Sequence, residues 1–127
     1  MVTLREVMSS SLLSVAPEAT VAEAAQLMSV RHVGSCLILD GERLIGIFTE
    51  RDIVRALASD FDAAGHAVAG WMTRDPVGLG PDATTGQALD RMLSEGFRHL
   101  PVIDEGRVVG VVSLRDLAPR QAGPAEP

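Results

Sequence analysis

The chain of 127 residues carries a formal net charge of -6 and is 46% hydrophobic, which fits one soluble domain and argues against nucleic acid, whose phosphates require clustered Lys and Arg. Every basic residue is an Arg, so the chain lacks the lysine of Schiff-base enzymes and of P-loops. Because it shows neither a secretory signal nor an apolar run near the ~20 residues that span a bilayer, we expect a cytoplasmic protein with no membrane partner.

An internal repeat organises the sequence. The offset that aligns Met8 with Met72 also aligns Gly46 with Gly110 and the pair Arg51-Asp52 with Arg115-Asp116. The repeat covers about residues 7–53 and 71–117. We therefore predict a first repeat with its lead-in over 1–58, a linker over 59–70, a second repeat over 71–118 and a disordered tail over 119–127.

In chain order, each half begins with a short apolar strand, near residues 12–15 and 76–79, and continues with a helix. Thr20 and Thr84 begin capping boxes, since Glu23 and Gln87 follow three residues later. The apolar positions of both helices then recur at helical spacing, which predicts one face turned to a core. These positions are Val21, Ala24, Ala25 and Met28 in the first helix, and Thr85, Ala88, Leu89 and Met92 in the second.

Two apolar strands follow in each half, at 36–39 and 44–48 and again at 100–103 and 108–112. Asp40-Gly41 between the first two is typical of a tight hairpin. A second helix is expected after Thr49 and, more briefly, after Ser113. The fold class is therefore α/β (α+β), with tandem β-α-β-β-α repeats, and the two halves should share one core because a lone repeat would bury too little surface. Cys36, the only cysteine, is expected in a buried strand.

The repeated stretches 46–52 and 110–116 share one pattern: Gly, two apolar residues, Thr or Ser, two variable residues and Asp. At a strand-to-helix junction this pattern offers backbone N–H groups and a hydroxyl to a phosphate, and a carboxylate to a ribose diol. The Gly leaves room for a ligand or another backbone segment. The same pattern is also an ordinary capping box, and the two roles are compatible.

The stretches 71–73, 96–104 and 110–116 resemble a cystathionine-beta-synthase-type (CBS) repeat. Stretches 33–40 and 46–52 resemble the first half of small bacterial proteins that consist of one CBS pair. The resemblance implies a Bateman module of two repeats with pseudo-twofold symmetry, which binds AMP, ADP, ATP or S-adenosylmethionine in clefts between its sheets. It also implies a homodimer.

By this resemblance, the aspartates of the repeated pattern bind ribose, its hydroxyls face phosphate, and the basic residues before the proline of the second repeat approach phosphate. The implied ligand-binding residues are Thr49, Arg51, Asp52, Arg98, His99, Pro101, Ser113, Arg115 and Asp116. The first repeat departs from the pattern, with Gly34, Ser35 and Leu37 where the second has Arg98, His99 and Pro101. We therefore expect either two sites of unequal affinity or one site that stays empty.

No cluster of His, Cys or carboxylates has metal-site spacing, and neither Ser113 nor Thr49 has a nearby His as a base, so we expect no catalytic residue, no metal and no required cofactor. The sequence favours a non-enzymatic sensor of an adenosyl ligand that acts as a homodimer or through an unknown partner protein. The alternative is a ligand-free structural or interaction protein with the same fold.

Overall fold

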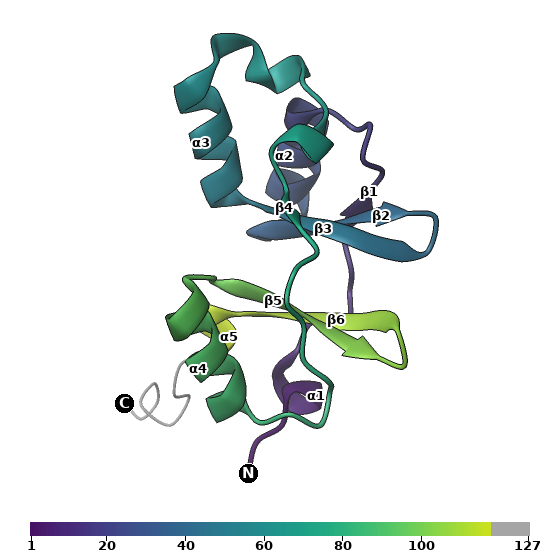
Figure 1. The fold of residues 1–127 in the computed structure, drawn as a ribbon, viewed down its shortest axis with the longest axis vertical. Coiled ribbons are helices and arrows are strands. Elements are labelled where there is room, and N and C mark those ends of the chain that lie inside the picture. Colours follow the sequence, from purple (N-terminus) through teal and green to yellow (C-terminus); the bar gives the residue numbers. More distant parts are fainter. Residues whose placement is uncertain (118–127) are drawn as a thin grey trace. The chain divides into compact units, whose positions relative to one another are not determined.

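In the computed structural model, which describes residues 1–117, the chain divides into two units that do not follow the repeat boundaries (Figure 1). One unit is the continuous stretch Leu12–Pro76. The other joins Met1–Ser11 to the chain from Val77 onward. The first eleven residues thus belong with the second half, although the sequence pattern assigned them to the first repeat. The tail expected over 119–127 lies outside the described residues.

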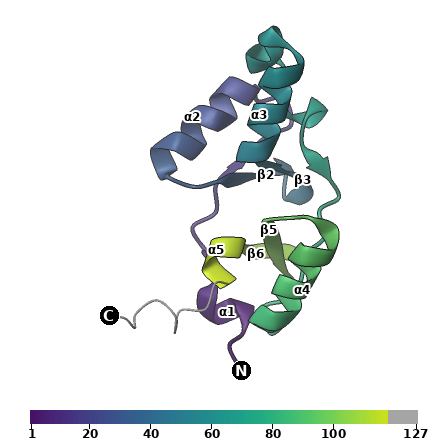
Figure 2. The same ribbon diagram turned by 90° about the vertical axis from the view of Figure 1, so that its left-hand side faces the viewer.

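The unit Leu12–Pro76 contains the complete β-α-β-β-α repeat predicted from the sequence. Its elements are β1 (Ser14–Val15), α2 (Val21–Arg31), β2 (Ser35–Asp40), β3 (Arg43–Thr49), α3 (Glu50–Ser59), the short 3-10 helices η1 (Phe61–Gly65) and η2 (Val68–Gly70), and β4 (Thr73–Arg74). They form a sheet in the order β1-β2-β3-β4, parallel between β1 and β2 and antiparallel elsewhere. Within this unit, α2 and α3 lie on the same side of the β2–β3 hairpin (Figure 2).

The second unit repeats most of this pattern. It contains α1 (Leu4–Val7), α4 (Thr85–Glu95), β5 (His99–Asp104), β6 (Arg107–Ser113) and α5 (Leu114–Leu117). The strand expected over 76–79 is reduced to one bridge, between Leu79 and Val102. Gly78 lies so close to Ile103 that a Cβ there would come within 2.6 Å of the Ile103 side chain.

The helices begin where the capping boxes predicted. The backbone N–H of Thr20 donates to Glu23 Oε1 at 2.8 Å, and the N–H of Glu23 donates back to Thr20 Oγ1 at 3.0 Å. Thr84 and Gln87 make the same reciprocal pair before α4. Each box satisfies two backbone donors that the first turn of a helix leaves unpaired, so it fixes where the helix starts.

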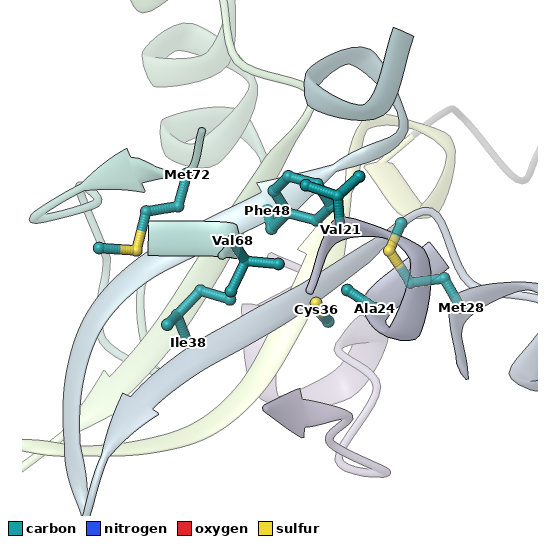
Figure 3. Packing of buried hydrophobic residues seen from close by; sticks show 8 residues of the cluster. All are labelled: Val21, Ala24, Met28, Cys36, Ile38, Phe48, Val68 and Met72. Carbon is teal, nitrogen blue, oxygen red and sulfur yellow. The ribbon is translucent and has the colours of Figure 1, made fainter. Parts of the chain in front are cut away.

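The buried apolar side chains gather in two clusters, one in each unit, where the sequence led us to expect a single shared core. The first cluster comprises Val21, Ala24, Met28, Cys36, Ile38, Phe48, Val68 and Met72 (Figure 3). The second comprises Leu4, Ala88, Met92, Leu100, Val102, Val112 and Leu117. The methionines of both helical faces, Met28 and Met92, are buried as predicted.

The segment expected as a solvated linker is folded into the first unit. Ala63 in η1 and Val68 in η2 are fully buried. The backbone N–H of Val68 donates to the carbonyl of Ala19 at 2.8 Å, and that of Val21 donates to the carbonyl of His66 at 2.9 Å. The sequence pattern did not predict this packing, because the segment is rich in Ala and Asp and its two apolar anchors are isolated in the sequence.

Each cluster is completed by a lead-in segment from the other half of the sequence. Met72, at the start of the second repeat, contacts Gly46 of the first, and Met8, at the start of the first repeat, contacts Gly110 of the second. A Cβ on Gly46 would lie 2.9 Å from Met72 Cγ, and a Cβ on Gly110 would lie 2.8 Å from Met8 Cγ. The glycine of the repeated pattern therefore makes room for a methionine side chain of a lead-in segment.

Candidate functional site

The two copies of the repeated pattern occupy equivalent junctions, β3 to α3 in the first unit and β6 to α5 in the second. Thr49 is the N-cap of α3 and forms a complete capping box with Asp52. In the second unit, the N–H of Ser113 donates to Asp116 Oδ2 at 2.8 Å, and the N–H of Asp116 donates to Ser113 Oγ at 3.2 Å. The capping role of the pattern is therefore confirmed in both repeats.

The Asp52 carboxylate is buried and fully engaged. Its side chain is 7% exposed. Oδ2 accepts hydrogen bonds from the Thr49 backbone N–H at 2.9 Å and from the Thr49 hydroxyl at 3.1 Å, while Oδ1 accepts one from Arg55 Nη2 at 3.0 Å. A buried carboxylate needs this set of donors, because an unpaired charge away from water is costly.

The equivalent Asp116 lies in a different environment. Its carboxylate accepts a hydrogen bond from the backbone N–H of Ser113 at 2.8 Å, and its side chain is only partly buried. In the sequence, the position that matches Arg55 in the second repeat is Pro119, which has no side-chain donor. The sequence therefore does not repeat the arginine partner of the first carboxylate at this position.

Arg55 and Trp71 are the residues of this region that sequence reasoning missed. The Arg55 guanidinium donates to the Trp71 carbonyl oxygen at 3.0 Å and lies over the indole ring, 5.7 Å from its centroid. The i, i+3 spacing of Asp52 and Arg55 on a helix was the available signal for the ion pair.

The other candidates of the second repeat lie along β5. His99 is the register partner of Ser113, and Pro101 is the partner of Val111, so His99 and Ser113 share one face of the hairpin. The carbonyl of Arg98 accepts a hydrogen bond from the Leu114 N–H at 2.8 Å. The structure thus brings Arg98, His99 and Ser113 to one end of the hairpin.

The first repeat has the same backbone framework with different side chains. The carbonyl of Gly34 accepts from the Glu50 N–H at 3.1 Å, and Ser35 is the register partner of Thr49. A hydroxyl and a hydrogen therefore replace the imidazole and guanidinium of the second repeat. Arg51 and Arg115, which begin the helices beside these groups, are exposed in both repeats.

Cys36 lies behind the first site, on the core face of β2, and its exposed fraction is 1%. Burial, together with the smaller effect of the negative charge of Asp52, raises the pKa of this thiol to about 12. A thiol with so high a pKa carries almost no thiolate at neutral pH. Cys36 is therefore a packing residue of the first cluster.

Within residues 1–117, no three His, Cys, Asp or Glu side chains come together where they could hold a metal ion. In the same part of the chain, none of the helices has the length and apolar character needed to cross a membrane.

Comparison with known proteins gives a consistent result. The model of the CBS domain family matches residues 4–59 and again residues 67–123. A 17.7 kDa protein of Acidianus ambivalens is 46% identical over 107 residues, which is 82% of this chain and 63% of that protein. The chain spans 63%, 40% and 20% of the lengths of the first three curated relatives that it matches.

Solved structures match over nearly the full length of both partners. A CBS-domain containing protein of Agrobacterium tumefaciens superposes with a TM-score of 0.86 at 29% identity, covering 91% of this chain and 95% of that one. The CBS domain pair of protein MJ0100, in complex with 5-methylthioadenosine and S-adenosyl-L-methionine, gives a TM-score of 0.86 at 25% identity and covers 98% of each chain.

Proposed function

Because this chain belongs to the CBS domain family and carries the domain twice, we propose that it is a non-enzymatic regulatory module that binds an adenosyl ligand such as AMP, ADP, ATP or S-adenosylmethionine. No cofactor is required for this role. We place it in the cytoplasm, where these nucleotides are abundant.

The observation that carries the proposal is the partly exposed carboxylate of Asp116, which follows Ser113 at the end of the hairpin that also holds His99 and Arg98. A carboxylate that reaches solvent can receive the hydroxyls of a ribose, and the neighbouring hydroxyl and basic side chains can meet a phosphate. The similar pair of protein MJ0100, which holds two adenosyl compounds, supports this class of ligand.

Thermal unfolding in the presence of AMP, ADP, ATP, adenosine and S-adenosylmethionine tests the proposal. A ligand at ~100 times its dissociation constant adds roughly 2.7 kcal/mol to the free energy of unfolding, which raises Tm by several degrees for a chain of this size. We expect a selective rise with one or more of these compounds, and guanosine nucleotides serve as the control. An unchanged Tm with every adenosyl compound would contradict the proposal.

Substitution of Asp116 tests the ribose role. Asp116→Asn keeps an oxygen that can accept from the Ser113 N–H but removes the charge that would bind the diol. We expect it to weaken binding by roughly 10-fold to 100-fold, the effect of losing a charged hydrogen-bond partner, with little change in stability. Calorimetric titration measures the affinity. Asp90→Asn, on the exposed surface of α4, is the matched control.

The ligand signal must reach another molecule, and we propose a homodimer or a partner protein as the receiver. Support comes from the apolar side chains that the neighbouring helices α2 and α3 leave exposed, which are Leu27, Val30, Val54 and Leu57. Val54→Glu should shift a dimer towards monomer in light scattering, whereas Glu18→Gln, on an exposed loop, should not.

The same exposed side chains favour one second candidate, a CBS pair that works as an interaction protein without any ligand. In that case Val54→Glu would disrupt assembly, and no nucleotide would alter either Tm or the assembly.

A further inference from the structure

In the first repeat, the Arg55 guanidinium is already paired with the Asp52 carboxylate, which is the group that would bind a ribose. Arg55 Nη2 lies 3.0 Å from Asp52 Oδ1, and the Arg55 side chain is itself 54% exposed. The two hydroxyls of a ribose bind a carboxylate best through both of its oxygens. In Asp52, one oxygen carries Arg55 and the other carries two donors from Thr49.

From this contact, and resting on the proposed function, we propose that Arg55 is a specificity-determining residue that competes with the ligand for Asp52. A site whose binding-competent state is rare shows an apparent affinity lowered by the population of that state. The first repeat is then the weaker site because Arg55 must leave Asp52 before a ribose can bind there.

The second repeat has no arginine at the position equivalent to Arg55. Pro119 stands at the position equivalent to Arg55, and Val7 stands at the position equivalent to Trp71. These two positions therefore supply neither a cation like Arg55 nor an aromatic ring like that of Trp71. Gly34 and Ser35 offer a ligand fewer contacts than the corresponding residues of the second repeat, which makes the bound state less stable. Arg55 pairs with Asp52, which makes the ligand-free state more stable.

Trp71 links the competition to the lead-in segment of the second repeat. Arg55 donates to the Trp71 carbonyl at 3.0 Å and covers its ring at 5.7 Å. When a ligand takes Asp52, Arg55 loses the anchor that holds it in this position, and both contacts with Trp71 weaken. Trp71 is the only tryptophan in the chain, so its fluorescence reports on this one contact.

The test compares Arg55→Met and Arg55→Lys in an Asp116→Asn background, which leaves the first repeat as the main site. Adenosine and AMP are the probes, titrated by calorimetry. We expect Arg55→Met to bind adenosine roughly tenfold more tightly than the background protein, because the competitor is gone. Arg55→Lys, which keeps a cation but loses the planar fork, should fall between the two.

Adenosine carries no phosphate, so the loss of a positive charge does not weaken its binding and the competition is measured alone. The matched control is Arg43→Met, which removes the same charge from the exposed hairpin at the opposite end of β3. Adenosine affinity in Arg55→Met that is no higher than in Arg43→Met would overturn the proposal, provided that circular dichroism shows both variants to be folded. Should Arg55→Met not fold, the same comparison is made with Arg55→Lys.

A second readout needs no ligand. Asp52→Asn should weaken the hold on Arg55 and so increase the quenching of Trp71 fluorescence by acrylamide. Unchanged quenching would overturn the link to Trp71. If the unmodified protein binds adenosine or AMP and Arg55→Met does not bind more tightly, the competition fails while the sensor function stands. If no variant binds either compound, both fail together.

Discussion

Burial raises the pKa of the Cys36 thiol to about 12 from an ordinary value of 9.0, with the charge of Asp52 as a second cause. The chain contains neither Lys nor Tyr, and Arg stays protonated throughout this range, so Cys36 is the one side chain that titrates between these two values. Between these two values, the pH dependence of the free energy of unfolding therefore reports on Cys36.

We predict that stability falls as pH rises from about 9 to 12. The folded thiol has the higher pKa, so its contribution is fully present below the pKa of the unfolded chain and is lost as pH approaches the folded value. Urea unfolding over a pH series measures the slope. Cys36→Ala should be less stable at neutral pH and much less dependent on pH above 9. An equal slope in both proteins would contradict the assignment.

Asp52 and Asp116 show how far single residues could be predicted. Their place at two strand-to-helix junctions followed from the repeated pattern, and both capping interactions are confirmed. Their different environments did not follow, because the partner that separates them, Arg55, lies outside the repeated motif. The ligand roles of both residues stay predictions.

At the scale of elements, a methionine from each lead-in segment lies against the glycine of the repeated pattern. Gly46→Ala would place a methyl group against Met72 and 3.0 Å from the Thr73 carbonyl oxygen. We predict a loss of about 1–3 kcal/mol, the usual cost of overpacking. Gly110→Ala, which faces Met8, should cost a similar amount. Chemical denaturation measures both.

Gly70→Ala is the control for these substitutions, because a Cβ at Gly70 has no neighbour within 4 Å. Combining Gly46→Ala with Met72→Ala should cost less than the sum of the two single changes, since the pair is in contact. A strictly additive result would mean that Met72 is not what excludes a side chain at position 46.

The elements that could be predicted are those with local signals. Capping boxes fixed the starts of α2 and α4, and the Asp-Gly turn and alternating apolar residues gave the first hairpin. The prediction of a strand over 76–79 was wrong because this short apolar run pairs at only one residue, Leu79. The burial of Val68 could not be predicted, because it depends on partners that are far away in the sequence.

At the scale of the whole molecule, the division of the chain into two units can be tested with fragments. We predict that a fragment over 12–76 folds, because it contains every residue of the cluster around Phe48. A fragment over 1–58, which follows the repeat boundary read from the sequence, should not fold, since it lacks Val68 and Met72. Circular dichroism and urea unfolding distinguish the two. Equal stability of both fragments would contradict the division into units.

The exchange of lead-in segments could not be predicted because the two segments look alike. Each has an apolar residue followed four positions later by a methionine, Leu4 with Met8 and Val68 with Met72. Nothing in this pattern says which repeat a segment covers. That choice depends on the path of the backbone, which brings each segment beside the hairpin of the other half.

The position of Leu4 has a consequence for protein synthesis. Its burial partners Leu100, Val102 and Val112 lie near the other end of the chain, so it leaves the ribosome long before they do. At about 5–20 residues per second, the first eleven residues wait on the order of 10 s for the surface that will cover them. Over the same interval the stretch Leu12–Pro76 can complete its own cluster. A segment that is translated before most of this chain is therefore among the last to be buried.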